Sequence, residues 1–217
     1  MPFVLPSQLL SAALKEHDLV PSVVPADFTP SVALDVVFPG RKSFSVGEKL
    51  TKEEASQEPQ IAFLNVEDIG PDEPSSYTIV FVDPDAPSRQ DQKFGQWRHW
   101  VQPGLRPPSI QALASLAGGA TSDVDIKISE ATAQPFATKE KEAATPWRGP
   151  GPNPGSGTHR YTFLLFREPK SSDFVIDAQE DLGGGNEFEQ RRKWNAMEFA
   201  AKKGLTLVGV TFFTVDG

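Results

Sequence analysis

Short apolar runs, separated by turn-forming residues, dominate the hydrophobic pattern of the chain. Alternating or continuous apolar residues predict strands at 32–37, 61–66, 77–82, 97–102, 124–129, 160–166 and 205–215. The run at 77–82, Tyr-Thr-Ile-Val-Phe-Val, is apolar almost throughout, which indicates a central strand covered on both faces. The 20 prolines and 17 glycines favour many turns and few long helices.

Helical spacing of apolar residues is confined to the two ends of the chain. Ser7 can cap a first helix that runs to about His17 and has one apolar face. Residues 187–203 combine an apolar stripe, lysines near the C-terminal end and Gly204 as a stop, so we expect a helix over this range. Elsewhere, loops are expected at 47–60 and 130–158, and a short helix or an irregular connection at 107–116.

The order of these elements places helices at the ends and strands in the middle. Because strands and helices do not alternate regularly, the pattern argues against a doubly wound parallel sheet. We predict a mainly β fold, an antiparallel β sandwich with a few peripheral helices. The whole chain, 1–217, is expected to form a single domain, with an N-terminal helical extension at 1–30 and a C-terminal helix within 184–204.

The charge and the absence of cysteine exclude several classes. The net charge is -8 and the pI about 4.9, without the basic stripe that nucleic-acid binding needs. Without cysteine there are no disulfides, zinc ribbons or thiol nucleophiles. The N-terminus has no basic leader, and no apolar run approaches the roughly 20 residues of a membrane span. We therefore expect a cytoplasmic protein without nucleic-acid or integral membrane contact.

Two segments carry the candidate chemistry. Residues 83–89, Asp-Pro-Asp-Ala-Pro-Ser-Arg, leave the end of the buried strand, and a rigid strand end is a usual place for a binding site. Residues 151–161 form a glycine-rich segment whose backbone amides can donate to an anion. The simpler interpretations are a stiff turn in the first case and a flexible loop in the second.

The histidines add polar groups to both segments. His17 ends the first helix, where a structural role is expected, whereas His99 and His159 lie beside the two unusual segments. An anion bound there would meet histidine N–H groups, the Tyr161 hydroxyl and backbone amides. Its binding should then tighten as the pH falls through the range in which histidine takes up a proton.

An enzyme is the alternative. Asp83, His99 and His159 also make up the donor set of a two-histidine, one-carboxylate metal site. Asp83 begins an Asp-Pro-Asp sequence similar to the Asp-x-Asp metal motif of glycosyltransferases. Neither Ser88 nor Ser156 has a base that the sequence places beside it, so no nucleophile is evident.

Taken together and in this order, the motifs resemble the phosphatidylethanolamine-binding protein family. They are Asp-Pro-Asp-Ala-Pro-Ser-Arg, Trp-x-His-Trp and Gly-Ser-Gly-x-His-Arg-Tyr. The resemblance extends to the N-terminal helix and to the closing Leu-Val-Gly-Val-Thr-Phe-Phe, and so covers nearly the whole chain. It is strongest to the fungal carboxypeptidase-inhibitor branch of the family, which also includes kinase inhibitors and flowering regulators.

The resemblance implies a β sandwich with a pocket for phosphate-like groups. The implied pocket residues are Asp83, Ala86, Pro87, Trp97, His99, Gly151, Pro152, His159 and Tyr161, with Asp85, Arg89 and Arg160 as structural support. Two positions depart from the family pattern. Phe212 or Phe213 stands where members often have an aromatic hydroxyl, and Arg98 where many have another histidine.

The function implied is that of a regulator without a cofactor or catalytic residues. It would bind a phosphate or a phospholipid headgroup and inhibit a partner, most simply a serine carboxypeptidase, with residues 1–10 as the candidate inhibitory segment. The alternative within the family is a scaffold that regulates kinase signalling.

Overall fold

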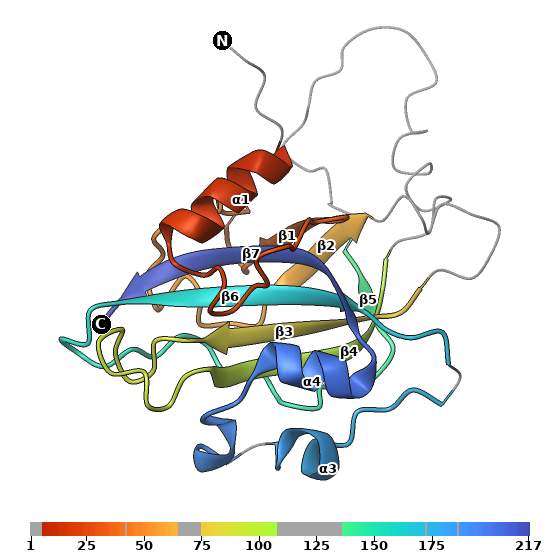
Figure 1. Ribbon diagram of the computed structural model, residues 1–217. Helices are drawn as coiled ribbons and strands as arrows, with labels where there is room; N and C mark the ends of the chain where they lie inside the picture. Colours follow the sequence, from red (N-terminus) through yellow and green to blue (C-terminus); the bar gives the residue numbers. More distant parts are fainter. Residues whose placement is uncertain (1–5, 42, 65–74, 108–135, 172, 186) are drawn as a thin grey trace, which may run out of the picture.

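The computed structural model describes residues 6–41, 43–64, 75–107, 136–171, 173–185 and 187–217 (Figure 1). The strands are β1 (Ala33–Val37), β2 (Gln60–Leu64), β3 (Tyr77–Asp83), β4 (Trp97–Arg106), β5 (Thr138–Lys139), β6 (Thr158–Arg167) and β7 (Thr206–Asp216). The helices are α1 (Pro6–Glu16), α3 (Ala178–Leu182) and α4 (Ala196–Lys203), with a 3₁₀ turn at Glu189–Arg191. Within these ranges, an antiparallel sheet has the order β5-β4-β3-β6-β7, and β1 and β2 form a second antiparallel sheet.

The larger sheet is buried on both faces. Side chains alternate along β3, so Ile79 and Phe81 point to one face and Val80 and Val82 to the other. The first face packs against β1 and β2, and the second is covered by α1 and α4 (Figure 1). Every residue of β3 is buried, as predicted for a central strand. The prediction of a mainly β, antiparallel fold with peripheral helices is therefore confirmed.

The helix predicted over 187–203 is wrong in its first half. Only a 3₁₀ turn forms at Glu189–Arg191, and Lys193 then takes a left-handed φ of 52°. Asn195 follows in an extended conformation, with φ -131° and ψ 114°, and its side chain caps α4. Neither backbone conformation can continue a helix, so α4 begins only at Ala196.

Smaller differences lie at the ends of other elements. The first helix begins at Pro6, so Ser7 lies inside its first turn, and β4 extends to Arg106. The short β5 lies within a stretch predicted to be a loop. The strand predicted at 124–129 and all but the first residue of 107–116 lie outside the described residues. No helix in the described part of the chain has both the length and the apolar character needed to cross a membrane.

Antiparallel pairing brings the two candidate segments to one edge of the sheet. The C-terminal end of β3 lies beside the N-terminal ends of β4 and β6, with Asp83 paired to Trp97 and Val82 to Thr162. Residues 83–89 and 151–161 therefore meet at the same edge, although they are far apart in the sequence.

Candidate functional site

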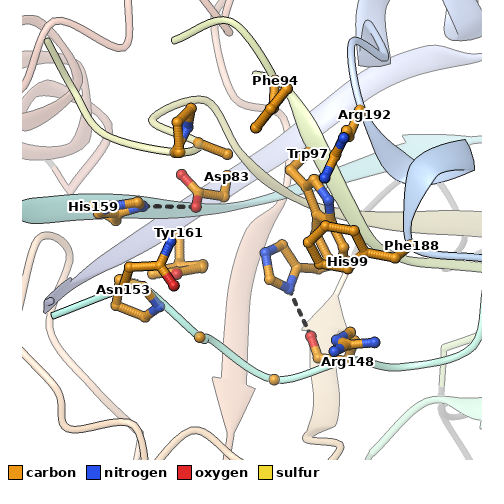
Figure 2. Close-up of a pocket in the computed structure, with 15 residues that line it drawn as sticks. Asp83, Phe94, Trp97, His99, Arg148, Asn153, His159, Tyr161, Phe188 and Arg192 are labelled. Atoms are coloured by element: carbon orange, nitrogen blue, oxygen red, sulfur yellow. Dashed lines mark hydrogen bonds and ion pairs between the residues drawn. The ribbon is translucent and has the colours of Figure 1, made fainter. Parts of the chain in front are cut away.

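A cavity of about 500 Å³ opens at this edge of the sheet (Figure 2). It is lined by all nine residues predicted for the pocket, Asp83, Ala86, Pro87, Trp97, His99, Gly151, Pro152, His159 and Tyr161. Six further residues line it, of which only Asn153 belongs to a segment singled out from the sequence: Phe94, Arg148, Gly149, Asn153, Phe188 and Arg192. The structure thus assembles the predicted residues around one space, and their role in binding stays a prediction.

Asp83 is buried at the inner end of the cavity and is fully engaged with the protein. Its Oδ2 lies 2.8 Å from Nδ1 of His159, and its Oδ1 accepts the backbone N–H of Asp85 at 2.7 Å. The Tyr161 hydroxyl is also hydrogen-bonded to this carboxyl. Burial raises the pKa of Asp83, and the hydrogen bond with His159 partly opposes that rise. Asp83 therefore orients His159 and Tyr161.

A hydrogen-bonded chain of acid, imidazole and hydroxyl runs through His159. Its Nε2 lies 2.9 Å from Oγ of Ser156, so the structure places a base beside Ser156, which the sequence alone could not show. The order Asp83–His159–Ser156 is that of a hydrolase triad. However, the Ser156 hydroxyl donates to the Asn153 carbonyl at 2.7 Å, and Ser156 is not among the residues that line the cavity. The chain of hydrogen bonds thus fixes the glycine-rich loop and presents no nucleophile to the cavity.

His99 offers the cavity a hydrogen-bond acceptor. Its Nδ1 lies 2.7 Å from the Arg148 carbonyl oxygen, which can only accept, so Nδ1 carries the proton. Burial lowers the pKa of His99 to about 3, and the positive charges of Arg191 and Arg148 add to this. Figure 2 shows its second nitrogen facing the inner end of the cavity. Tightening of anion binding between pH 8 and 5.5 therefore cannot come from protonation of His99.

Arg98 points away from the cavity because side chains alternate along β4, and its neighbours Trp97 and His99 both line the cavity. The register pairs Phe81 with Trp100 but Val82 with Arg98, which leaves His99 without a partner between them, as in a β-bulge. Arg98 is fully buried on the other face. It donates to Thr145 Oγ1 at 2.7 Å and to the carbonyl oxygens of Leu182, at 2.9 Å, and Gly184, at 2.5 Å. This departure from the family pattern is therefore structural.

The second departure from the family pattern, at Phe212 or Phe213, also lies in the core. Phe212 and Phe213 are fully buried on opposite faces of the sheet, and neither lines the cavity. The ring of Phe213 stacks on the ring of Tyr161 with centroids 5.5 Å apart, and so helps to position the Tyr161 hydroxyl, which faces the cavity. Phe212 meets the ring of His17 edge-on at 4.9 Å, which gives His17 a packing role.

The predicted supporting residues tie the first segment to the end of α1. Asp85 and Arg160 form a buried pair, with Nε–Oδ2 at 2.9 Å and Nη2–Oδ1 at 2.6 Å. Burial acts to raise the pKa of Asp85, but its hydrogen bonds with Arg160 outweigh that effect and lower it. Nη1 of Arg160 donates to the carbonyls of His17 and Asp18. Arg89 pairs with Asp18 at 2.6 Å near the surface and does not reach the cavity.

The mouth of the cavity is a cluster of arginines and aromatic rings that sequence reasoning missed. The Arg148 guanidinium lies over Trp97 at 5.9 Å and Phe188 at 5.6 Å. That of Arg192 lies over Phe188 at 4.8 Å and Phe94 at 4.0 Å. Arg148 lies three residues before the glycine-rich segment, and this nearness in the sequence is the one signal that pointed to it. Phe188 and Arg192 come from the stretch that was predicted to be a continuous helix.

The geometry does not favour a metal centre at the inner end. In the part of the chain that the structure describes, no group of three or more His, Cys, Asp or Glu residues is arranged to hold a metal ion. Asp83 and His159 bind each other, and His99 directs one nitrogen to a backbone carbonyl. What the cavity can do is bind a small polar group in an aromatic setting.

Comparisons with known proteins agree with this geometry. The family model described as "Phosphatidylethanolamine-binding protein" matches residues 40–213. The carboxypeptidase Y inhibitor of Saccharomyces cerevisiae is 30% identical, over 93% of this chain and 92% of its own length. Among solved structures, a carboxypeptidase Y inhibitor complexed with its cognate proteinase matches with a TM-score of 0.70 at 24% identity, over 97% of this chain and 96% of that chain. The phosphatidylethanolamine-binding protein from Plasmodium vivax matches with a TM-score of 0.62 at 18% identity, over 94% and 96% of the two chains. The likenesses to solved structures show the fold.

Proposed function

Because this chain belongs to the phosphatidylethanolamine-binding protein family, we propose that it is a non-enzymatic binding protein that inhibits a serine carboxypeptidase. The observation that carries the proposal is the 30% identity to a carboxypeptidase Y inhibitor over almost the full length of both chains.

The second part of the proposal is that the cavity binds a small phosphate-bearing group, such as a phospholipid headgroup. Ligand sites are typically concave, largely apolar and equipped with a few polar groups that fix orientation. The cavity at the edge of β3, β4 and β6 has this character, and the arginines at its mouth suit an anion.

For the inhibitory surface, we propose the N-terminal segment, residues 1–10. The exposed side chain of Leu9 on α1 supports this, because 59% of it is accessible although it is a large apolar residue. Val175 is similarly exposed, at 64%, on a different part of the chain, and it provides a matched control.

The test is inhibition of a serine carboxypeptidase acting on a blocked dipeptide, measured with the intact chain and two variants. We expect Leu9→Asp to weaken inhibition about tenfold or more, as the loss of an apolar interface contact would, and Val175→Asp to leave it unchanged. Absence of inhibition by the intact chain at micromolar concentration would reject the inhibitor role. Recovery of a kinase, and no carboxypeptidase, on the immobilised chain would favour the signalling scaffold instead.

A further inference from the structure

Two arginine side chains behind the wall of the cavity are buried, and in the described part of the chain neither pairs with a carboxylate. Arg98 is fully buried and Arg191 is 4% exposed, and their guanidinium groups donate to carbonyl and hydroxyl oxygens. Burial lowers the pKa of each to about 10, so both stay protonated at neutral pH. Because a buried cation is costly unless acceptors surround it, the segments that supply these acceptors are held in place.

The first arginine connects β4 to residues 187–194, which we call the outer segment. Arg98 lies in β4 and reaches the chain just before the outer segment, where it donates to the carbonyl oxygens of Leu182 at 2.9 Å and Gly184 at 2.5 Å. Its guanidinium also lies over the ring of Trp194, at 5.4 Å. Arg98 therefore contacts the chain at both ends of the outer segment.

The second arginine makes the same kinds of contact in the opposite direction. Arg191 lies in the outer segment, and its Nη1 donates to the carbonyl oxygens of His99 in β4, at 2.9 Å, and Pro146, at 3.1 Å. Its guanidinium lies over the ring of Trp97 in β4, at 5.5 Å. Each element thus sends one buried arginine to the backbone and to a tryptophan ring of the other side.

The outer segment supplies part of the mouth of the cavity. Phe188 and Arg192 both line the cavity, and the Arg192 guanidinium lies 4.8 Å from the Phe188 ring. Figure 2 shows these two side chains together, beside Trp97. Arg192 immediately follows Arg191 in the chain, so movement of the outer segment away from β4 would carry both mouth residues with it.

From this crossed arrangement we infer that Arg98 and Arg191 are positioning residues, which clamp the outer segment to β4 and so place Phe188 and Arg192 at the mouth of the cavity. The inference rests on the proposed function for what the mouth binds, and it adds two residues that do not line the cavity themselves. Arg98 serves three acceptors, the two carbonyls and the Thr145 hydroxyl. A histidine, with at most two ring N–H groups, could not serve all three.

Amide hydrogen exchange, followed by NMR, tests the clamp without a ligand. The N–H groups of Lys193 and Trp194 donate to the carbonyls of residues 94 and 96, both at 3.0 Å, so their exchange reports release of the outer segment. We expect Arg98→Lys to speed this exchange about tenfold or more, because a lysine cannot reproduce the fork of donors. Arg191→Met, which leaves no buried charge behind, should speed the same two amides.

Arg160→Lys is the matched control, because Arg160 is also a buried arginine that donates to backbone carbonyls, but it holds the end of α1. It should speed exchange of the Leu19 amide, which follows α1, and leave Lys193 and Trp194 unchanged. Uniform acceleration of all amides in Arg98→Lys would indicate a loss of global stability and overturn the inference. Unchanged exchange in the outer segment would overturn it as well.

Calorimetric titration with phosphoethanolamine separates positioning from general support of the fold. Arg98→Lys should weaken binding by up to about tenfold, as the loss of one charge-assisted hydrogen bond would. In a chain that already carries Phe188→Ala and Arg192→Gln, the same substitution should cause no further loss, because the groups that it displaces are gone. A further loss in that background would mean that Arg98 acts by another route, against the inference.

The two measurements also keep this inference separate from the proposed function. If the unmodified protein does not bind phosphoethanolamine, the phosphate ligand of the proposed function is rejected. The exchange of Lys193 and Trp194 still decides, by itself, whether Arg98 and Arg191 hold the outer segment.

Discussion

The imidazole of His99 lies between the rings of Trp97 and Tyr161, at centroid distances of 4.3 and 5.3 Å. Its pKa in the folded chain, about 3, is far below the ordinary value of about 6.5. As the pH falls below about 6.5, the unfolded chain takes up a proton at this residue and the folded chain does not. The contribution of His99 to stability is therefore complete above this pH and is lost progressively towards pH 3.

This shift predicts an acid sensitivity that one substitution should remove. Between pH 6.5 and 5.0, His99 should cost the unmodified protein up to about 2 kcal/mol of unfolding free energy. His99→Asn cannot titrate, so its loss over the same interval should be smaller by that amount. Urea unfolding at the two pH values measures the difference. Equal losses in the two proteins would show that His99 is protonated in the folded state.

At the scale of single residues, the sequence predicted the inner end of the cavity and missed its mouth. Asp83, His99 and His159 could be predicted because they belong to motifs at strand ends. Phe188 and Arg192 carry no local signal that they fold over a cavity formed by distant strands. The hydrogen bonds that occupy both nitrogens of His159 depend on three-dimensional geometry, so the sequence could not show that neither nitrogen is free.

Among the elements, α4 shows how a cap limits a helix. The Asn195 side chain accepts the backbone N–H groups of Met197 at 2.9 Å and Glu198 at 3.0 Å. We expect Asn195→Ala to reduce the unfolding free energy by about 1 kcal/mol, because two helix-end donors lose their acceptor. Asn195→Asp keeps an acceptor and should be nearly neutral. Urea unfolding of both variants measures the effect, and equal losses would argue against capping as the cause.

The incorrect helix prediction at 187–203 has a physical explanation. Apolar residues at helical spacing indicate which residues share a face, but they do not show whether the backbone is continuous. The break depends on Lys193, which occupies a left-handed conformation that its residue type rarely adopts. Asn195 followed three residues later by Glu198 is a helix-start pattern, and it was the available signal for where α4 begins.

For the molecule as a whole, the sequence predicted that both faces of the sheet are covered, but it did not predict which segments cover them. The continuous apolar run in β3 already required two covered faces, and the structure has them. The sequence did not indicate which segments would supply each cover, since this depends on connections between elements far apart in the chain. The same applies to the contact between residues 83–89 and the end of α1.

The buried pair of Asp85 and Arg160, which ties residues 83–89 to the end of α1, predicts a large effect on the free energy of unfolding. Asp85→Asn would leave the Arg160 guanidinium buried beside a neutral group, so we expect the free energy of unfolding to fall by about 3–5 kcal/mol. Arg89→Gln breaks the more exposed pair with Asp18 and should cost less than about 1 kcal/mol. Chemical unfolding compares the two variants. Similar small losses in both would mean that the buried pair contributes no more than a surface one.

Arg160 joins Asp85, which lies between the cavity residues Asp83 and Ala86 in the sequence, to the carbonyls that follow α1, and this has a thermodynamic consequence. A single cation shared by two regions makes their free energies interdependent, and such dependence is reciprocal. If an occupant of the cavity raises the affinity of α1 for a docking protein, that protein must raise the affinity for the occupant by the same factor. The N-terminal helix and the cavity would then report on each other's occupancy across the sheet.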